Sequence, residues 1–311
     1  MIVLIDGDIF RYRCAFAAER TRYLVEVTNA SGHKEFLGFE SKKEAESYGE
    51  RVTKGVNGAL FKVWSRKDLQ PLENCLQIVK SSLENALEAI QSRFPDEKLD
   101  YRIWLSGSKN FRDAIAKTKP YKGNRLETPK PSYYKDVGDY LVASWGAVYS
   151  EGIEADDAIG IAAMEARSNS AGYVLVTNDK DLRQIPGEHY DWIKKEFSTV
   201  SPKEAKQQLF AQILSGDPTD NIPGLEGIGP ATAAKILEGA QSPEEMVDRV
   251  YEAYIQHGPK YATPYLMEQW ELVYILRKPL AEFGGWQHTR EGEYFCSKYL
   301  QSSDAASSSS P

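Results

Sequence analysis

The feature that most constrains the fold is a series of short apolar runs separated by segments with helical periodicity. Residues 1–5 and 173–177 are such runs, and acidic residues follow each of them directly. Residues 101–105 and 147–150 are two further candidates for core strands. Buried strands that alternate with helices favour a parallel sheet. We therefore predict an α/β fold with a mostly parallel central sheet and helices on both of its faces.

The helical segments are recognised by their apolar spacing. Over residues 72–94, five aliphatic side chains recur three or four positions apart, which is typical of a helix with one buried face. Residues 153–167 predict a second core helix. From about residue 200 the pattern changes to helices punctuated by Gly and Pro, over 202–216, 230–238, 243–257 and 264–277.

Residues 21–70 form an excursion from this pattern. Residues 23–39 predict a β-hairpin, and Ser41 then opens a polar helix with Glu44 placed three positions later, as in a capping box. The Ser-rich end of the sequence has low complexity, which predicts disorder. The predicted organisation is an α/β core over 1–200 with the insertion at 21–70 and a basic arch at 107–135, a helical region over 201–300, and a disordered tail at 301–311.

Composition limits the class of protein. The 311 residues hold 38 Lys and Arg against 45 Asp and Glu, a net charge of −7, which favours an ordinary enzyme over a nucleic-acid-binding protein unless positive charge is concentrated locally. Three cysteines without C-x-x-C spacing speak against a disulfide framework and a zinc site. No apolar run approaches the roughly 20 residues that cross a bilayer, so we expect no membrane association.

Nine carboxylates fall at the predicted strand ends and helix starts. They form four sets: Asp6 and Asp8; Glu154, Asp156 and Asp157; Asp179 and Asp181; Asp217 and Asp220. Parallel sheets bind ligands beyond the carboxyl ends of their strands, so these sets would converge. On an extended strand end, residues two apart point the same way, which would align Asp6 with Asp8 and Asp179 with Asp181.

Such a cluster would repel itself strongly unless it binds cations. Oxygen ligands without nearby Cys or His suit Mg²⁺ or Mn²⁺, and two such ions can activate water and stabilise the leaving oxygen in phosphodiester hydrolysis. Taken alone, an Asp-Gly-Asp or Asp-Lys-Asp sequence is more often a solvated turn, and the Glu154–Asp157 set could be ordinary acid at a helix N-terminus. The coincidence of several sets at one sheet edge favours the metal site.

A basic segment supplies positive charge that the net charge conceals. Residues 102–135 hold nine Lys or Arg against Asp113 and Glu127, and aromatic residues are interleaved with them, among them Phe111, Tyr121, Tyr133 and Tyr134. Positive charge for phosphates and rings for stacking suit single-stranded or frayed nucleic acid, although a solvated basic face is the alternative. Further along, Gly227 and Gly229 predict a tight turn leading into a helix whose free N–H groups could bind phosphate.

Together these motifs resemble the 5′-nuclease family of flap endonucleases, phage 5′→3′ exonucleases and the 5′-nuclease domain of bacterial DNA polymerase I. The resemblance covers about residues 1–240, in the family order, through residues 5–8, 121–125, 152–157, 177–181 and 216–224 with the glycine hairpin. It is most similar to the phage-type enzymes, because no polymerase domain accompanies it. It implies a PIN-like core and a helix–three-turn–helix at about residues 216–238.

The resemblance implies roles for individual residues. Asp6, Glu154, Asp156 and Asp157 would hold a first metal ion, and Asp179, Asp181, Asp217 and Asp220 would serve a second, with Mg²⁺ or Mn²⁺ as the two ions. Lys122 and Arg125 would contact the scissile phosphate and form the catalytic set with Asp6 and Asp157. DNA contacts are implied for Arg112, Lys119, Tyr121, Lys122, Arg125, Gly227, Gly229, Thr232 and Lys235. A K⁺ ion at the helix–three-turn–helix is a further family feature.

One position departs from the family pattern. An Asp usually follows the second core strand, and here Gly107 stands in its place. We hypothesise that Asp8, two residues from Asp6, supplies the missing charge.

The resulting expectation is a Mg²⁺-dependent 5′→3′ exonuclease and structure-specific flap endonuclease. It would act as a monomer on DNA with free 5′ ends or 5′ flaps, in the cytoplasm, or in the host cytoplasm if a phage encodes it. Two alternatives remain open: a non-catalytic, structure-selective DNA-binding protein in which Gly107 marks a decayed site, and a PIN-type ribonuclease. The eight other family carboxylates count against the first alternative, and the glycine hairpin counts against the second.

Overall fold

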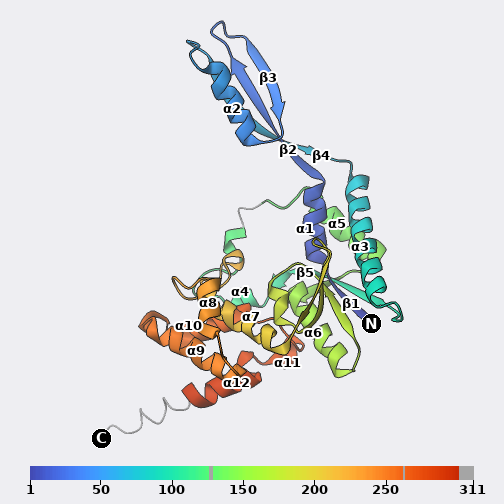
Figure 1. Ribbon diagram of the computed structural model, residues 1–311, viewed down its shortest axis with the longest axis vertical. Helices are drawn as coiled ribbons and strands as arrows, with labels where there is room; N and C mark the ends of the chain where they lie inside the picture. Colours follow the sequence, from blue (N-terminus) through green and yellow to red (C-terminus); the bar gives the residue numbers. More distant parts are fainter. Residues whose placement is uncertain (126–128, 262, 301–311) are drawn as a thin grey trace. The chain divides into compact units, whose positions relative to one another are not determined.

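The computed structural model describes residues 1–125, 129–261 and 263–300 (Figure 1). The chain divides into two compact units. The core unit comprises Met1–Ile9, Ser82–Pro129 and Leu141–Pro311, and the insertion unit comprises Phe10–Ser81 and Lys130–Tyr140. The predicted disordered tail at 301–311 lies outside the described residues, as does Glu127 of the basic segment.

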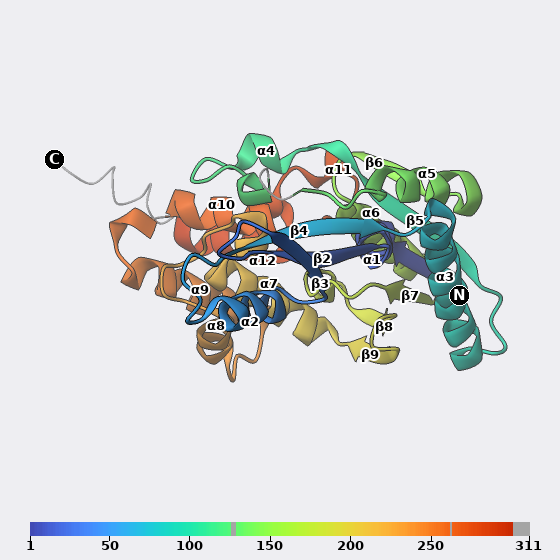
Figure 2. The same cartoon turned by 90° about the horizontal axis from the view of Figure 1, so that it is seen from above.

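The core unit contains a six-stranded sheet. Its strands are β1 (Ile2–Asp6), β5 (Asp100–Asn110), β6 (Val148–Gly152), β7 (Tyr173–Val176), β8 (Gly187–Asp191) and β9 (Glu196–Val200). They lie in the order β6-β5-β1-β7-β8-β9, and all neighbours are parallel except β9, which runs antiparallel to β8. In Figure 2, β7, β8 and β9 follow one another across this unit. The α/β fold with a mostly parallel sheet is confirmed.

Helix α6 (Ala155–Ser168) packs on the central strands of this sheet. Leu4 of β1, Ile159 of α6 and Leu175 of β7 are fully buried in one apolar cluster. The chain enters α6 directly after β6, so the helix begins at the carboxyl edge of the sheet, where β1 and β7 also end. This edge therefore collects the ends of three elements that are far apart in the sequence.

The buried His189 on β8 makes fold stability sensitive to pH. Its Nε2 lies 2.8 Å from the Ile185 carbonyl oxygen, and burial lowers the pKa of His189 despite that hydrogen bond. The unfolded chain then takes up a proton before the folded chain does, so stability falls as the pH drops below about 6.5. We expect the melting temperature of His189→Gln to fall less than that of wild type when the pH is lowered from about 7 to about 5.

The measurement is a thermal melt across this pH range, with His33→Gln as the matched control because His33 is exposed. One proton can change the stability by at most about 1.4 kcal/mol per pH unit. Equal pH slopes for wild type and His189→Gln would show that His189 is not the group responsible.

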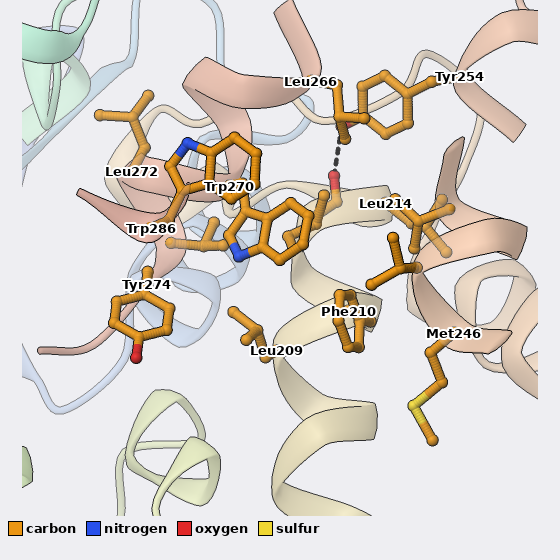
Figure 3. Packing of buried hydrophobic residues seen from close by; sticks show 14 of the residues in the cluster. Leu209, Phe210, Leu214, Met246, Tyr254, Leu266, Trp270, Leu272, Tyr274 and Trp286 are labelled. Atoms are coloured by element: carbon orange, nitrogen blue, oxygen red, sulfur yellow. Dashed lines mark hydrogen bonds between the residues drawn. The ribbon is translucent and has the colours of Figure 1, made fainter. Parts of the chain in front are cut away.

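The helical part of the core unit follows β9. It contains α7 (Pro202–Ser215), α8 (Pro230–Leu237), α9 (Pro243–Gln256), α10 (Thr263–Val273), α11 (Leu280–Phe283) and α12 (Arg290–Phe295). Its core is aromatic: the Trp270 and Trp286 rings stack with centroids 4.3 Å apart, and Phe210 meets Trp270 edge-on. The buried Tyr254 donates its hydroxyl to the Ile213 carbonyl oxygen at 2.5 Å (Figure 3).

The segment between α7 and α8 folds back tightly on itself. Gly216 and Gly224 have φ angles of +67° and +59°, and a Cβ on either residue would lie 2.2 Å from backbone atoms of this segment. Only glycine satisfies both conditions. Residue Gly227, with φ +79°, then turns the chain into α8, whose N-cap is Gly229, so the predicted glycine turn before a helix is confirmed.

The insertion unit contains an antiparallel three-stranded sheet in the order β3-β2-β4. Its strands are β2 (Glu19–Thr28), β3 (Lys34–Phe39) and β4 (Leu60–Leu69), and α2 (Lys42–Thr53) lies against one face (Figure 1). The predicted hairpin is confirmed, and the Ser41 side chain accepts a hydrogen bond from the Glu44 N–H. The third strand was not predicted, because basic residues interrupt its apolar alternation.

The C-terminal end of the basic segment is hydrogen-bonded within the insertion unit. Tyr133 donates its hydroxyl to the Gln70 carbonyl oxygen at 2.7 Å, and the Arg11 side chain donates to the Tyr134 carbonyl oxygen at 2.8 Å. Three helices each contain a point at which the chain passes from one unit to the other: α1 (Gly7–Ala17), α3 (Leu72–Arg93) and α5 (Tyr134–Trp145). No helix of the described ranges is long and apolar enough to cross a membrane.

Candidate active site

A first acidic cluster lies at the carboxyl edge of the sheet. Asp6 ends β1, Asp156 stands in the first turn of α6, and Asp179 follows β7. Burial, then Asp8, then Asp179 raise the pKa of Asp6 to about 8. Burial, then Asp6 and Asp179, raise the pKa of Asp156 well above its ordinary value. These carboxyl groups are close enough to resist simultaneous ionisation.

The backbone around two predicted carboxylate pairs, Asp6 with Asp8 and Asp179 with Asp181, is not the extended strand end that we predicted. Asp6 and Asp8 do not share an extended strand end, because α1 begins at Gly7 and Asp8 lies in its first turn. Asp8 Oδ2 accepts a hydrogen bond from the Ser106 N–H at 3.0 Å. Asp179 and Asp181 likewise lie in a turn, where Asp179 Oδ1 accepts from the Asp181 N–H at 2.8 Å. In both places the chain enters a helix or a turn directly after the strand. The rule that residues two apart on a strand point the same way therefore does not apply there.

A second acidic cluster surrounds a small cavity beside the first. The cavity, of about 20 Å³, is large enough for one water-sized group and is lined by five carboxylates: Glu154, Asp156, Asp181, Asp217 and Asp220. Burial, then Asp179, raise the pKa of Asp181 to about 7. Burial also raises the pKa of Asp220. The resemblance grouped Asp179 with this second set, whereas Asp179 acts on Asp6 and Asp156 as well as on Asp181.

Two lysines supply counter-charge to the second cluster. Lys122 contacts Glu154 and lies 3.6 Å from Asp220, while Lys180 contacts Asp217 and lies 2.7 Å from Asp181. Burial alone would raise the pKa of Glu154, but Lys122 and Arg112 outweigh it and lower that pKa. In the same way, Lys180 overcomes burial and lowers the pKa of Asp217. Lys122 holds this position with φ +53°, an uncommon conformation for a non-glycine residue.

Tyr121 and Arg125 are tied to the same carboxylates. The Tyr121 hydroxyl lies 2.7 Å from Glu154 and 2.8 Å from Asp220, and its side chain is buried. We expected Tyr121 to contact DNA, but its ring is not free to stack on a base. Arg125 donates to the Thr219 carbonyl oxygen at 3.0 Å and contacts Asp220, while its side chain stays partly exposed.

Arg112 and Asp157 form a buried ion pair. The guanidinium donates to both carboxylate oxygens, at 2.7 and 2.8 Å, and also to the Leu272 and Tyr274 carbonyl oxygens. Both side chains are buried, so the expectation that Arg112 contacts DNA is corrected. Asp157 also accepts from the Leu276 N–H at 3.0 Å. Its Oδ2 also accepts a hydrogen bond from the Glu154 N–H at 3.1 Å, so this carboxylate is occupied within the protein and holds the start of α6.

The base of the basic segment is anchored to α10. Glu268 accepts hydrogen bonds from the Lys117 and Thr118 N–H groups, each at 2.7 Å, and from the Thr118 hydroxyl. Lys119 follows in an exposed loop. Between β5 and α5, the described residues form only two short helical turns, α4 (Arg112–Ile115) and a 3₁₀ turn at Gly123–Arg125.

Of the predicted duplex-contact residues, Gly227, Gly229 and Thr232 lie at the start of α8 and Lys235 lies in its last turn. Gly227, Gly229, Thr232 and Lys235 are all solvent-exposed, and a Cβ on either glycine would meet nothing within 4 Å. The backbone N–H groups of this turn are therefore approachable. Their contact with DNA, and a K⁺ ion nearby, stay predictions.

Gly107 occupies a crowded place on β5. A Cβ there would lie 2.6 Å from the Ser150 carbonyl oxygen of the neighbouring strand. An aspartate at this position would require the backbone to move. The Asp8 carboxylate instead reaches this strand through Ser106, one residue away, which supports the hypothesis that Asp8 supplies the missing charge.

Three site residues escaped the sequence analysis. Thr177 donates its hydroxyl to Asp6 at 3.1 Å, Gln212 donates to Asp181 at 2.6 Å, and Lys180 bridges Asp181 and Asp217. Lys180 could have been found, because it stands between two predicted ligands in the sequence. Gln212 lies in the middle of α7, and no local pattern marks it.

The donor set fits a hard divalent cation in its chemistry. Its oxygen-only carboxylates are buried, repel one another, and line a cavity of suitable size. Within the described ranges, however, no three His, Cys, Asp or Glu side chains already converge as around a metal ion. Lys122 and Lys180 instead hold the second set of carboxylates in place.

Comparison with known proteins gives the class. Residues 74–210 match the family described as 5′-3′ exonuclease, N-terminal resolvase-like domain. The 5′-3′ exonuclease of Bacillus subtilis is 30% identical over 192 residues, covering 56% of this chain and 61% of that protein. DNA polymerase I of Rhizobium leguminosarum is 35% identical over 162 residues, covering 48% of this chain and 16% of the polymerase. The match thus spans about a sixth of the polymerase and about three fifths of the exonuclease.

Among solved structures, the chain is similar to the T5 5′-exonuclease with divalent zinc ions bound, at 18% identity and a TM-score of 0.48. That match covers 62% of this chain and 80% of the T5 chain. By its sequence relatives, the chain is similar to the 5′–3′ exonuclease and flap endonuclease family, which is related to the 5′-nuclease domain of DNA polymerase I.

Proposed function

We propose that this chain is a divalent-metal-dependent 5′→3′ exonuclease and flap endonuclease that hydrolyses DNA near 5′ ends and single-strand/duplex junctions. The observation that carries the proposal is the pair of buried acidic clusters at the carboxyl edge of the sheet, with Lys122 and Arg125 beside them. The similarity to 5′-3′ exonucleases supports a nuclease activity.

In this proposal the metal-holding residues are Asp6, Asp8, Glu154, Asp156, Asp179, Asp181, Asp217 and Asp220. Bound Mg²⁺ or Mn²⁺ would supply a nucleophilic water and charge stabilisation at the phosphate. Asp157 is left out of the set because Arg112 occupies its carboxylate.

The chain's own cations have a separate role. Lys122 and Arg125 are placed to neutralise the charge that develops on a phosphate brought to the acidic clusters. Tyr121 orients Glu154 and Asp220 through its hydroxyl, and Thr177 orients Asp6. Glu268 fixes the first residues of the loop that carries Lys122. Each of these contacts holds a charged group in a defined position before substrate arrives.

The DNA-binding half of the proposal places duplex on the start of α8. Exposed backbone N–H groups at Gly227 and Gly229 suit phosphate contacts that do not read sequence. A PIN-type ribonuclease would not need this turn. A non-catalytic protein would not need acidic groups kept so close together in a buried site.

The decisive test is cleavage of 5′- and 3′-labelled flap DNA, blunt DNA and a matching RNA, with Mg²⁺ or with EDTA. We expect cleavage near the 5′ end of DNA with Mg²⁺ only. Lys122→Ala should lower the rate by about 10²–10³-fold, as loss of one electrostatic contact in the transition state does.

Lys98→Ala is the matched control, because Lys98 is exposed near the start of β5, at the opposite edge of the sheet. Cleavage that persists in EDTA, or that is confined to RNA, would refute the proposal. A full rate in Lys122→Ala would remove Lys122 from the site.

A further inference from the structure

The sheet of the insertion unit has one covered face and one open face. Toward α2, Val25 is fully buried, Phe39 contacts the Tyr48 ring, and a Cβ on Gly49 would clash with Phe61. Alternate residues of each strand point away from α2. These are positions 20, 22, 24, 26 and 28 of β2, positions 34, 36 and 38 of β3, and positions 60, 62, 64, 66 and 68 of β4, which together define the open face.

Large apolar side chains stand exposed on the open face. Phe36 is 61% exposed, Trp64 51% and Leu60 70%. The register places Phe36 opposite Glu26, and Trp64 opposite Leu24. Two strand spacings, about 10 Å, separate the edge strands that carry the two rings, too far for the rings to stack on each other. Exposed apolar groups gathered on one face indicate a binding surface.

Positive charge is interleaved with these rings. Along β4, Leu60, Lys62, Trp64 and Arg66 alternate on the open face. The strands contribute five basic residues to this face and two acidic ones: Arg20, Arg22, Lys34, Lys62 and Arg66 against Glu26 and Asp68.

The two acids already have basic partners. Glu26 pairs with Lys34 at 2.6 Å, and Asp68 pairs with Arg66 at 2.7 Å and with Arg22 at 3.3 Å. Glu40, just beyond β3, lies 3.7 Å from Arg22. With Glu40 included, the surface still carries a surplus of positive charge, which is complementary to a polyanion.

We propose that the open face binds single-stranded DNA, with bases stacked on Phe36 and Trp64 and phosphates held by Lys62 and Arg66. Rings that protrude from a flat sheet between cations suit unpaired bases, since a duplex hides the base faces. A protein partner could bind through the apolar side chains alone, and the alternating lysine and arginine would add less to its affinity. The choice of DNA over RNA rests on the proposed function; the binding itself does not.

The test is the affinity of the full chain for a fluorescent oligo(dT), measured by anisotropy in EDTA so that no cleavage contributes. Phe36→Ala with Trp64→Ala should weaken binding at least about tenfold, the effect of losing stacking on two rings. Lys62→Gln with Arg66→Gln should flatten the dependence of affinity on salt. Phe16→Ala with Tyr101→Ala is the matched control, because both aromatic side chains are exposed elsewhere.

Further arms separate the alternatives. Binding of blunt duplex should be unchanged in Phe36→Ala with Trp64→Ala, and Trp64→Phe should keep most oligo(dT) affinity because a ring remains.

Unchanged oligo(dT) affinity in the double variant overturns the proposal. Stronger binding of oligo(U) than of oligo(dT) through these rings overturns the choice of DNA. Self-association that the double variant abolishes, without a change in oligo(dT) affinity, would make the face a protein interface instead. A chain that binds oligo(dT) through these rings but cleaves nothing would refute only the proposed function.

Discussion

Asp156→Asn should abolish most DNA cleavage and at the same time stabilise the metal-free protein. Asp156 is crowded by Asp6 and Asp179 in a buried site, which is why its pKa is raised well above the ordinary value. A neutral amide of the same size removes that repulsion and the need to bury a charge. It also removes an oxygen ligand from the proposed metal site, so we expect the cleavage rate to fall by about 10²–10³-fold or more.

Two measurements of the melting temperature check the stability part of this prediction. The metal-free melting temperature should rise by at least about 2 °C, which corresponds to roughly 1 kcal/mol in a large domain. Added Mg²⁺ should stabilise wild type, because an ion that binds only the folded state shifts the unfolding equilibrium, and this gain should largely vanish in Asp156→Asn. Asp96→Asn, an exposed acid outside the site, is the control. A melting temperature below that of wild type would contradict the repulsion argument.

Asp157→Ala, one residue further on, should have the opposite effect on stability. The substitution leaves the buried Arg112 guanidinium without its carboxylate and removes the acceptor for the Leu276 N–H. Breaking a buried pair by removing one partner costs about 3–5 kcal/mol. We expect the melting temperature to fall by roughly 10 °C.

The double variant Arg112→Met with Asp157→Leu separates charge from packing, because two apolar side chains of similar volume should restore much of the lost stability. The Mg²⁺-dependent rise in melting temperature should persist in Asp157→Ala, in contrast to Asp156→Asn. If Asp157→Ala also loses that rise, Asp157 is a metal ligand, as the family resemblance implies. A loss of less than about 1 kcal/mol would show that the ion pair is not structurally important.

The central sheet could be predicted because its signals are local. The four apolar runs became β1, β5, β6 and β7, and the helix predicted over 72–94 spans Leu72–Arg93. Strands β8 and β9 were missed because each has only five residues and most of these are polar. The helix predicted over 264–277 ends at Val273, where the chain turns extended and its carbonyl groups accept hydrogen bonds from Gln184 and Arg112.

Most of the acidic residues were found for the same reason, since they stand close to strand ends, whereas Asp217 and Asp220 follow α7. Their grouping was not predictable, because it depends on contacts between distant segments. Arg112 looks like any other member of a basic run, yet its partners are Asp157, 45 residues away, and the Tyr274 carbonyl, 162 residues away. Tyr121 is a comparable case, with Asp220 as its partner 99 residues on. Spacing in the sequence identifies the residues that could form a site. Contacts between distant segments determine which of them are buried and which face solvent.

The loop that carries Lys122 is fastened at its two ends to different parts of the molecule. Glu268 holds Lys117 and Thr118 within the core unit, whereas Tyr133 and Tyr134 are bonded within the insertion unit. The Lys122 N–H donates to the Asp220 carbonyl oxygen at 2.9 Å, and the Arg125 side chain donates to the Thr219 carbonyl oxygen at 3.0 Å. The stretch from Lys117 to Arg125 is thus fixed by contacts within the core unit, so the conformational entropy of ordering it is lost on folding rather than on substrate binding.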